Sequence, residues 1–176
     1  MERKQLDSLI QQMQDGDETA FALLYAETKK GVFSYLYTFT TQRELAEDLM
    51  QETYIKVRQN VQSYKLGTNP IAWLLQIAKN LALNEFKRGN KQVLTDFNEF
   101  DVPDSVSVEE QADSHVFDTI NKNLSKEEAR IVLLHLVNGL KHREIAELIS
   151  KPLGTVLWSY KNSLEKLKKI LKKEEE

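Results

Sequence analysis

Apolar residues recur at spacings of three and four along most of the chain, which is the period of an amphipathic helix. No segment alternates between apolar and polar residues as a half-buried strand would. The pattern therefore predicts an all-α protein. The expected helices lie near residues 5–14, 18–39, 42–62, 70–88, 108–122, 126–138, 141–149 and 153–173.

Capping signals support these boundaries. The S/T-x-x-E capping box occurs at Thr41 with Glu44, Ser107 with Glu110, and Ser125 with Glu128. Asn69 precedes Pro70, which places a capping residue before a proline at the first helical position. Gly139 is expected to end the helix that begins near Lys126.

The composition is that of a folded protein. The chain has 176 residues, 41% hydrophobic and 29% charged, enough for one ordinary domain or two small ones. It has no cysteine, and its three histidines lack metal-ligand spacing, so we expect no metal and no cofactor. No signal peptide and no apolar run of about 20 residues is present, so we expect no membrane insertion and a cytoplasmic location.

Charge is segregated along the chain, although the formal net charge is only −3. Every charged side chain from Gln92 to Asp118 is acidic, and this stretch contains Pro103. Lysine and arginine cluster on both sides of it. The sequence therefore predicts two small helical domains, 1–91 and 113–176, joined by an acidic linker at 92–112.

The second domain has the pattern of a helix-turn-helix. A short helix carries Ala146 where close helix crossing favours a small residue, and Pro152 and Gly154 form the turn. The next helix has an apolar stripe that we expect to form its core: Leu153, Val156, Leu157, Tyr160, Leu164, Leu167 and Leu171. The opposite face carries Thr155, Trp158, Ser159, Asn162 and Lys166. A helical hairpin with no DNA-binding role can show the same pattern, but we favour a DNA-binding helix-turn-helix.

Two helices of the first domain have distinctive outer faces. In the helix near 42–62 an inner stripe of Leu45, Leu49, Thr53 and Val57 leaves an acidic row outside: Glu44, Glu47, Asp48, Gln51 and Glu52. Such a row is most often only a solvated face. The helix near 70–88 presents Gln76, Lys79, Asn80, Asn84, Lys87 and Arg88. Amide hydrogen-bonding groups mixed with phosphate-binding cations are typical of a DNA-facing surface.

The chain resembles the extracytoplasmic-function (ECF) sigma factors of the sigma-70 family over nearly its full length. Asp-Leu-Met-Gln-Glu at 48–52 is similar to the family's polymerase-binding helix. The segment 73–88, which begins with Trp-Leu and ends with Arg88, is similar to the family's minus-ten segment. Glu-Ile-Ala at 144–146 with Gly-Thr-Val at 154–156 is similar to its minus-thirty-five reader. Each motif is weak alone, and their order and spacing carry the resemblance.

The resemblance implies a region-2-like bundle and a region-4-like helix-turn-helix with core RNA polymerase, promoter DNA and an anti-sigma factor as partners. The residues expected at the polymerase contact are Glu44, Asp48, Gln51 and Glu52. Those expected at the minus-ten element are Tyr64, Lys79, Asn80, Asn84, Lys87 and Arg88, with Tyr64 offering an aromatic face to an unstacked base. Those expected at the minus-thirty-five element are Arg143, Thr155, Trp158, Ser159, Lys161, Asn162 and Lys166.

The sequence departs from the family pattern after Gly-Thr-Val. The family commonly continues with a serine and several arginines, whereas this chain has no arginine after Arg143. Lysine lacks the bidentate fork that distinguishes guanine, so the minus-thirty-five sequence does not carry over from relatives. Trp158 has three possible partners: the minus-thirty-five groove, the other domain or an anti-sigma protein, or a neighbouring helix of its own domain.

Other functions remain open at the level of sequence. A one-component helix-turn-helix regulator is the principal alternative, and a helical protein-interaction module is a third. We expect no enzymatic activity, because the sequence shows no nucleophile-base pair, glycine-rich phosphate loop, metal cluster or paired buried acids.

Overall fold

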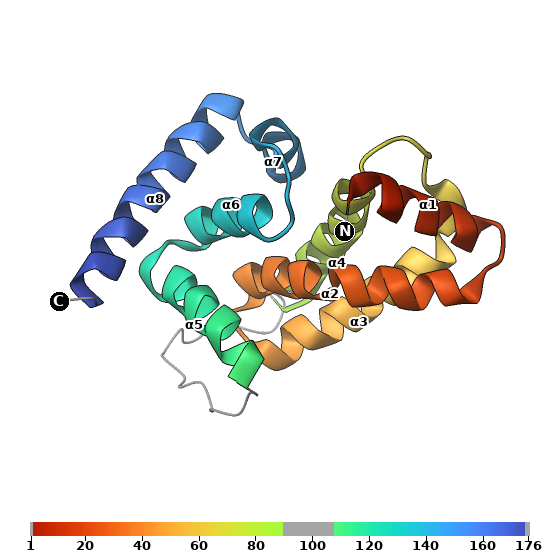
Figure 1. Cartoon of the computed structure of the whole chain (residues 1–176), viewed down its shortest axis with the longest axis horizontal. Coiled ribbons are helices and arrows are strands. Elements are labelled where there is room, and N and C mark those ends of the chain that lie inside the picture. Colours follow the sequence, from red (N-terminus) through yellow and green to blue (C-terminus); the bar gives the residue numbers. More distant parts are fainter. Residues whose placement is uncertain (1, 90–107, 175–176) are drawn as a thin grey trace.

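The computed structural model describes residues 2–89 and 108–174, and all regular secondary structure in these two ranges is helical, as predicted. The elements follow one another in chain order (Figure 1). They are α1 (Arg3–Gln14), α2 (Glu18–Thr40), α3 (Arg43–Gln59), the 3₁₀ turn η1 (Val61–Ser63), α4 (Pro70–Gly89), α5 (Val108–Asn123), α6 (Lys126–Leu136), α7 (His142–Ile149) and α8 (Leu153–Glu174). Most of the predicted linker lies outside the described residues.

The capping predictions have different outcomes. Ser125 caps α6 in a full capping box with Glu128, and the Asn69 side chain accepts hydrogen bonds from two backbone N–H groups in the first turn of α4. The prediction for Thr41 was wrong. This residue takes a left-handed conformation (φ 54°) as the C-cap of α2, and α3 begins after Gln42. Ser107 lies outside the described residues.

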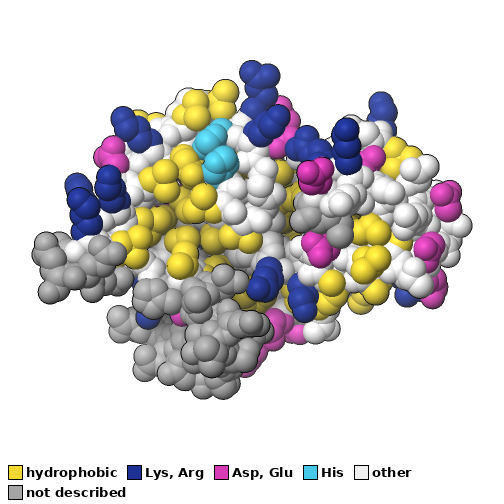
Figure 2. Space-filling model, in the orientation of Figure 1, with side chains coloured by type: hydrophobic (Ala, Val, Ile, Leu, Met, Phe, Trp, Pro, Cys, Tyr) yellow, Lys and Arg dark blue, Asp and Glu magenta, His cyan; other side chains and the backbone are white. Residues whose placement is uncertain are grey.

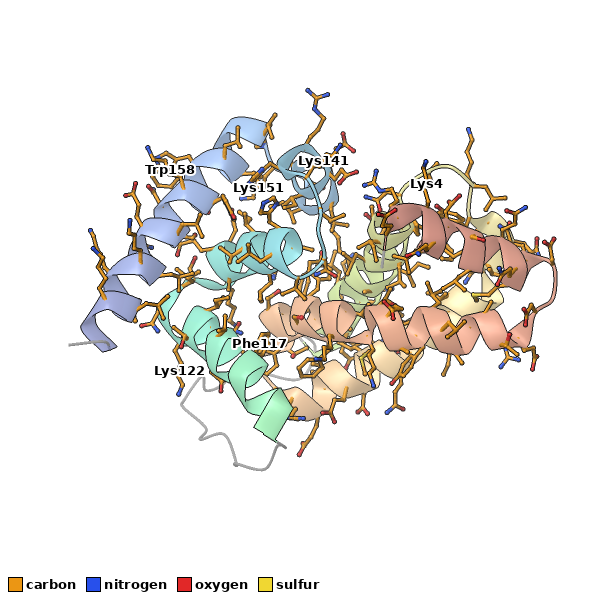
Figure 3. All side chains as sticks on the ribbon, in the orientation of Figure 1. Lys4, Phe117, Lys122, Lys141, Lys151 and Trp158 are labelled. Carbon is orange, nitrogen blue, oxygen red and sulfur yellow. The ribbon has the colours of Figure 1, made fainter. Side chains whose placement is uncertain are left out.

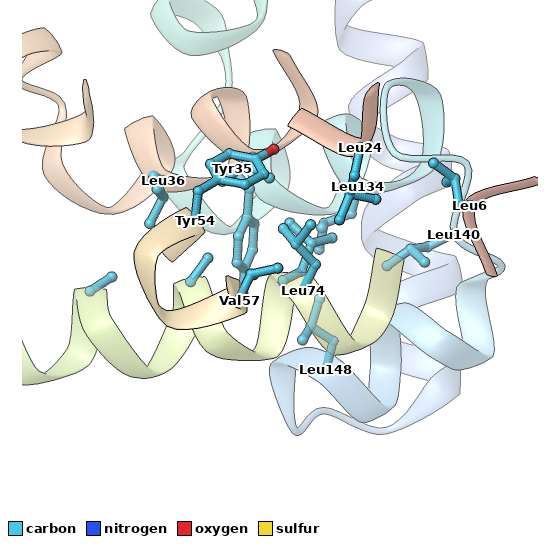
Figure 4. Packing of buried hydrophobic residues seen from close by; sticks show 14 of the residues in the cluster. Leu6, Leu24, Tyr35, Leu36, Tyr54, Val57, Leu74, Leu134, Leu140 and Leu148 are labelled. Atoms are coloured by element: carbon cyan, nitrogen blue, oxygen red, sulfur yellow. The ribbon is translucent and has the colours of Figure 1, made fainter. Parts of the chain in front are cut away.

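The first four helices pack around a core of fully buried side chains (Figure 4). Helix α2 runs through the middle of the molecule, and α1, α3 and α4 pack against it. Its buried contribution includes Leu24, Tyr35 and Leu36, which belong to the same buried cluster as Val57 of α3 and Leu74 of α4. This packing fixes which face of α3 and of α4 remains in solvent.

The last four helices form the helix-turn-helix and its support. Helices α7 and α8 pack on each other and on α6, and α5 packs against α6 and α8. A small second cluster of buried residues lies here, including Ile120, Val132, Leu133 and Leu167. This cluster holds α5 and α8 to the far side of α6.

The two helical groups share a hydrophobic core. Leu134 of α6, Leu140 in the turn and Leu148 of α7 belong to the same buried cluster as Leu24 and Leu74 (Figure 4). Helix α6 lies against α2, and α7 lies against α4. In this structure the two helical groups form one packed body.

Candidate polymerase and nucleic-acid interfaces

Helix α3 presents the predicted acidic row to solvent. Its inner side is buried through Ala46, Leu49, Thr53 and Val57. The four side chains expected at the polymerase contact are all exposed: Glu44, Asp48, Gln51 and Glu52. None of them forms an ion pair within the described residues, whereas neighbouring Glu47 is held by Arg43 at 2.9 Å. The row is therefore available to a partner.

An apolar groove lies beside this row, and it was not anticipated from the sequence. It has a volume of about 520 Å³ and runs between α2 and α3. Its lining consists of Phe21, Tyr25, Gln51, Tyr54, Ile55, Arg58 and Gln59. Ile55 is 56% exposed, because it lies on the side of α3 opposite the inner stripe. The α3 face therefore offers apolar surface next to carboxylates.

Helix α4 brings four of the six predicted minus-ten residues together. Asn80, Asn84, Lys87 and Arg88 are all exposed and follow spacings of three and four, so they share one helix face. The Gln76 amide donates a hydrogen bond to the Asn80 side chain at 3.0 Å, which orients that amide. This face can offer base-reading amides and phosphate-binding cations along one line.

Lys79 does not join this row. Its side chain is partly buried, and its Nζ donates a hydrogen bond to the backbone carbonyl of Leu148 in α7 at 2.6 Å. In this arrangement the Lys79 ammonium group contacts the helix-turn-helix and is not free to hold a phosphate.

The prediction of an exposed Tyr64 was wrong. The side chain is only 4% exposed, its hydroxyl donates a hydrogen bond to Asp7, and its ring packs on Trp73 with centroids 5.1 Å apart. Burial, and then the hydrogen bond to Asp7, raises the pKa of Tyr64 to about 12. Asp7 also accepts from the backbone of Gly67, so it fastens the loop to α1. Sequence reasoning missed this contact because Asp7 is 57 residues away.

Helix α8 is rotated relative to its predicted orientation. Its buried stripe contains Val156, Ser159, Ser163 and Leu167, and the Ser163 hydroxyl donates to the Ser159 carbonyl. Ser159 is therefore not on the outer face, and that prediction was wrong. Three leucines expected in the core are instead 39–47% exposed: Leu157, Leu164 and Leu171. Small serines allow α8 to approach α6 closely, which leucines at those positions would prevent.

Most of the other residues predicted for the minus-thirty-five element are exposed, on α8 and, for Arg143, on α7. Trp158 is 67% exposed and points away from α6 (Figure 3), which excludes burial within its own domain. Arg143, Thr155 and Lys161 are exposed, and Asn162 is partly exposed. Lys166 is exposed but forms an ion pair with Glu128 at 2.7 Å. The face therefore combines an aromatic ring, short polar groups and lysine.

Two histidines and a tyrosine form an aromatic cluster at the junction of α6, α7 and α8. The His135 and His142 rings are stacked with centroids 4.4 Å apart, and both meet Tyr160 edge to face. His135 Nδ1 pairs with the Leu140 carbonyl, while His142 Nε2 is buried with no hydrogen-bond partner among the described residues. Burial, and then the charge of His135, lowers the pKa of His142. The described residues contain no group of three or more side chains suited to a metal ion.

Comparison with known proteins agrees with this arrangement. Residues 24–92 match the family model "Sigma-70 region 2". The chain is 27% identical over 164 residues to the ECF RNA polymerase sigma-E factor of Haemophilus influenzae, covering 85% of this chain and 86% of the relative. It is 26% identical over 178 residues to the ECF sigma factor SigW of Bacillus subtilis, covering 93% and 95%.

Solved structures show the same fold. CnrH, in complex with the cytosolic domain of CnrY, has a TM-score of 0.64 at 18% identity, over 96% of this chain and 97% of that one. The sigma factor RpoE of Bartonella quintana, in complex with the anti-sigma factor NepR, has a TM-score of 0.64 at 21% identity, over 86% and 96%.

The chain belongs to the sigma-70 family, as a member of its ECF group. The region 2 match covers α3 and α4, the two helices that carry the exposed acidic row and the amide and cation row. Within the part of the chain that the structure describes, no helix is both long enough and apolar enough to cross a membrane.

The histidine cluster predicts a pH-dependent stability. Because the folded-state pKa of His142 lies below its ordinary value near 6.5, the unfolded chain binds the proton first as the pH falls. This contribution to stability is fully present above the unfolded-state pKa and is lost as the pH falls toward the folded-state pKa. His142→Phe keeps a ring against His135 and Tyr160 without a titrating group. Between about pH 7.5 and 5.5, the free energy of unfolding measured with denaturant should therefore fall more for the natural protein than for the variant. Identical pH profiles would contradict the prediction.

Proposed function

We propose that this sigma factor binds core RNA polymerase through α3, reads the minus-ten promoter element with α4, and reads the minus-thirty-five element with α7 and α8. One observation carries the proposal. Within the region that matches sigma-70 region 2, two adjacent helices bury their apolar sides and leave outside one acidic row and one row of amides and cations. A one-component regulator would need no such polymerase-binding row.

The α3 surface suits a basic, partly apolar helix of a partner. The exposed carboxylates of Glu44, Asp48 and Glu52 can steer such a helix and fix its register. The groove beside them gives it apolar area to bury, through Ile55 and the aromatic residues of α2. Charge and apolar area together distinguish this face from an ordinary solvated one.

Charge reversal on α3 should abolish tight polymerase binding. Asp48→Lys combined with Glu52→Lys places like charges opposite the partner and should weaken core affinity by about a hundredfold or more. The affinity can be measured by fluorescence titration of purified core polymerase. Asp15→Lys combined with Glu147→Lys makes the same charge change at two exposed sites outside α3 and should bind normally. Unchanged core affinity of the α3 variant, with its helical content intact, would show that the docking face is elsewhere.

The α4 row suggests a division of labour at the minus-ten element. Asn80 and Asn84 present amides that can pair with base edges, whereas Lys87 and Arg88 present cations that hold phosphates on any sequence. Tyr64 has no part in this proposal while it stays buried against Trp73.

Substitutions on α4 should separate these roles. Asn80→Ala with Asn84→Ala should reduce the preference for the best minus-ten sequence over single-base variants, by about 1–3 kcal/mol for each amide that pairs with a base. Lys87→Ala with Arg88→Ala should weaken binding to all sequences and lower the salt slope by roughly 0.7 for each phosphate held on single-stranded DNA. Salt titrations of promoter complexes measure both quantities. Equal effects of the two variants on every promoter would refute the division.

The exposed face of α8 supports a minus-thirty-five role for Trp158. The residue lies in the second turn of the second helix, where a helix-turn-helix places its base contacts. An indole ring can contact thymine methyl groups, so apolar contact would replace arginine hydrogen bonds and favour an A/T-rich element. Lys161 would anchor phosphates beside it.

Trp158→Ala should leave the melting temperature unchanged, because the side chain is already 67% exposed, and should weaken binding to a minus-thirty-five duplex. Leu157→Ala is a matched control, since it removes a neighbouring apolar side chain that is 47% exposed and points in a different direction. An equal decrease of binding in both variants would contradict a specific groove contact. Heightened transcription by Trp158→Ala would instead assign the ring to a restraining partner.

An anti-sigma factor is the remaining expected partner. Two structural neighbours were solved in complex with CnrY or with NepR, and we propose a restraining protein of this kind here. Apolar side chains gather over α6 and α8 (Figure 2), and the exposed ones include Leu136, Val137 and Leu164. Sigma factors act within a polymerase that supplies the catalytic centre, so we propose a cytoplasmic role with no enzymatic activity of the chain itself.

A further inference from the structure

Three aromatic side chains join the helix-turn-helix to the helix that supports it. His135 lies in the last turn of α6, His142 is the first residue of α7, and Tyr160 lies within α8. The two imidazole rings stack with their centroids 4.4 Å apart. The Tyr160 ring meets them edge to face, at 4.9 Å from His135 and 4.7 Å from His142. Each of the three helices therefore contributes one ring to the same contact.

This ring contact sets the orientation of α8 relative to α7. A helix-turn-helix reads bases with a few side chains of its second helix, and such contacts tolerate only about 10–20° of misorientation. Thr155 and Trp158 face outward less than two turns before Tyr160. A contact that anchors Tyr160 therefore also orients the side chains that are proposed to meet the minus-thirty-five element.

The surroundings of His142 disfavour a positive charge. As the first residue of α7, it lies at the positive end of the helix dipole. An imidazolium ring carries N–H groups on both nitrogens, and the buried Nε2 of His142 has no hydrogen-bond partner among the described residues. Burial, and then the charge of His135, lowers the pKa of His142. His142 therefore fits this contact as a neutral ring.

Neighbouring charges do not compensate a proton on the pair. The other titratable and charged groups that lie beside or against the two histidines are Lys141, Arg143, Glu144 and Tyr160. Glu144 is the one carboxylate in this set, and it already accepts hydrogen bonds from Arg3 and from the Lys141 backbone. Lys79 of α4 contacts the other end of α7, at Leu148. Two imidazolium rings 4.4 Å apart would therefore repel each other with no free carboxylate from this set between them.

Protons from solvent have access to the pair. Both histidines are partly exposed, and the histidine side chains drawn in Figure 2 reach the surface of the molecule. Histidine is the side chain whose charge ordinarily changes between about pH 5 and 8. The ring contact can therefore respond to pH in the folded chain.

We propose that His135, His142 and Tyr160 position α8 for the minus-thirty-five element, and that a second proton on the histidine pair releases this contact and weakens minus-thirty-five binding as the pH falls. The DNA target of this inference rests on the proposed function of α7 and α8, whereas the ring contact is a property of the chain itself. The direction is the reverse of a simple charge effect, because an added cation on a DNA-binding surface strengthens its attraction to phosphates.

The test compares three forms of the protein, each bound to core polymerase, at about pH 7.5 and about pH 5.5. The probe is a labelled promoter duplex whose start site has been mapped by in vitro transcription with this protein, and binding is followed by fluorescence anisotropy. His142→Phe keeps a ring without a titrating group, and His142→Ala removes the ring. At the higher pH the natural protein should bind like His142→Phe and several-fold more tightly than His142→Ala. At the lower pH it should bind like His142→Ala, while His142→Phe keeps its advantage.

Two controls separate positioning from general effects of pH. A promoter that keeps the minus-ten element but has a scrambled minus-thirty-five element should not distinguish the three forms. His115→Gln removes the remaining histidine, in α5, and should keep the pH dependence of the natural protein.

Three results would overturn the proposal. The first is tighter binding by the natural protein than by His142→Phe at the lower pH, since the histidine would then act only as a cation toward phosphate. The second is the same pH profile for these two forms. The third is equal binding by His142→Phe and His142→Ala at the higher pH, since the ring would then have no positioning role.

Nuclear magnetic resonance of the free chain tests the contact without DNA. Nuclear Overhauser effects between the Tyr160 ring and the two imidazole rings should be present at the higher pH and lost at the lower one. In His142→Phe the contacts between Tyr160 and the new ring should persist at both. Contacts in the natural protein that survive protonation of both histidines would overturn the release. If no start site depends on this protein, the proposed function fails, while these spectra still decide whether the ring contact responds to pH.

Discussion

The packing of α6 on α2 determines how the rest of the molecule is arranged. It buries Leu134 in the same core as Leu24 and brings the largely buried Arg130 against Phe39. Burial lowers the pKa of the Arg130 guanidinium, and removing such an ion from water costs several kcal/mol unless it is compensated. Two hydrogen bonds to Thr38 and the ring of Phe39 provide that compensation. The contact is therefore specific, since a shifted helix would leave a buried cation without its partners.

This packing also decides which surfaces remain for partners. Because the inner sides of α3 and α4 pack against α2, the acidic row and the amide and cation row remain exposed to solvent. Because α6 and α7 bury the inner stripe of α8, Trp158 and Lys161 face outward. The exception is Lys79, which contacts α7. One body thus exposes the acidic row of α3, the amide and cation row of α4 and the outer face of α8 at the same time.

The sequence predicts the helices well and their contacts poorly. Periodicity locates each helix, and the local signal of Asn69 before Pro70 correctly marks the start of α4, because both depend on neighbouring residues. The buried face of α8 was predicted wrongly. The spacing of its leucines indicates one buried face, whereas the structure buries Ser159 and Ser163 on a different face. The pairing of Asn138 with Gly31 joins residues 107 positions apart, and no local pattern specifies it. The predicted polymerase, minus-ten and minus-thirty-five roles of individual residues stay predictions.

The identity of the chain as a promoter-specificity subunit is tested most directly by transcription with purified core polymerase. Genomic DNA would be transcribed with and without the protein, and the 5′ ends of the transcripts would be sequenced. The account predicts a small set of start sites that appear only with the protein and share two sequence elements about 25 base pairs apart, the upstream one A/T-rich. The same start sites with and without the protein would contradict it.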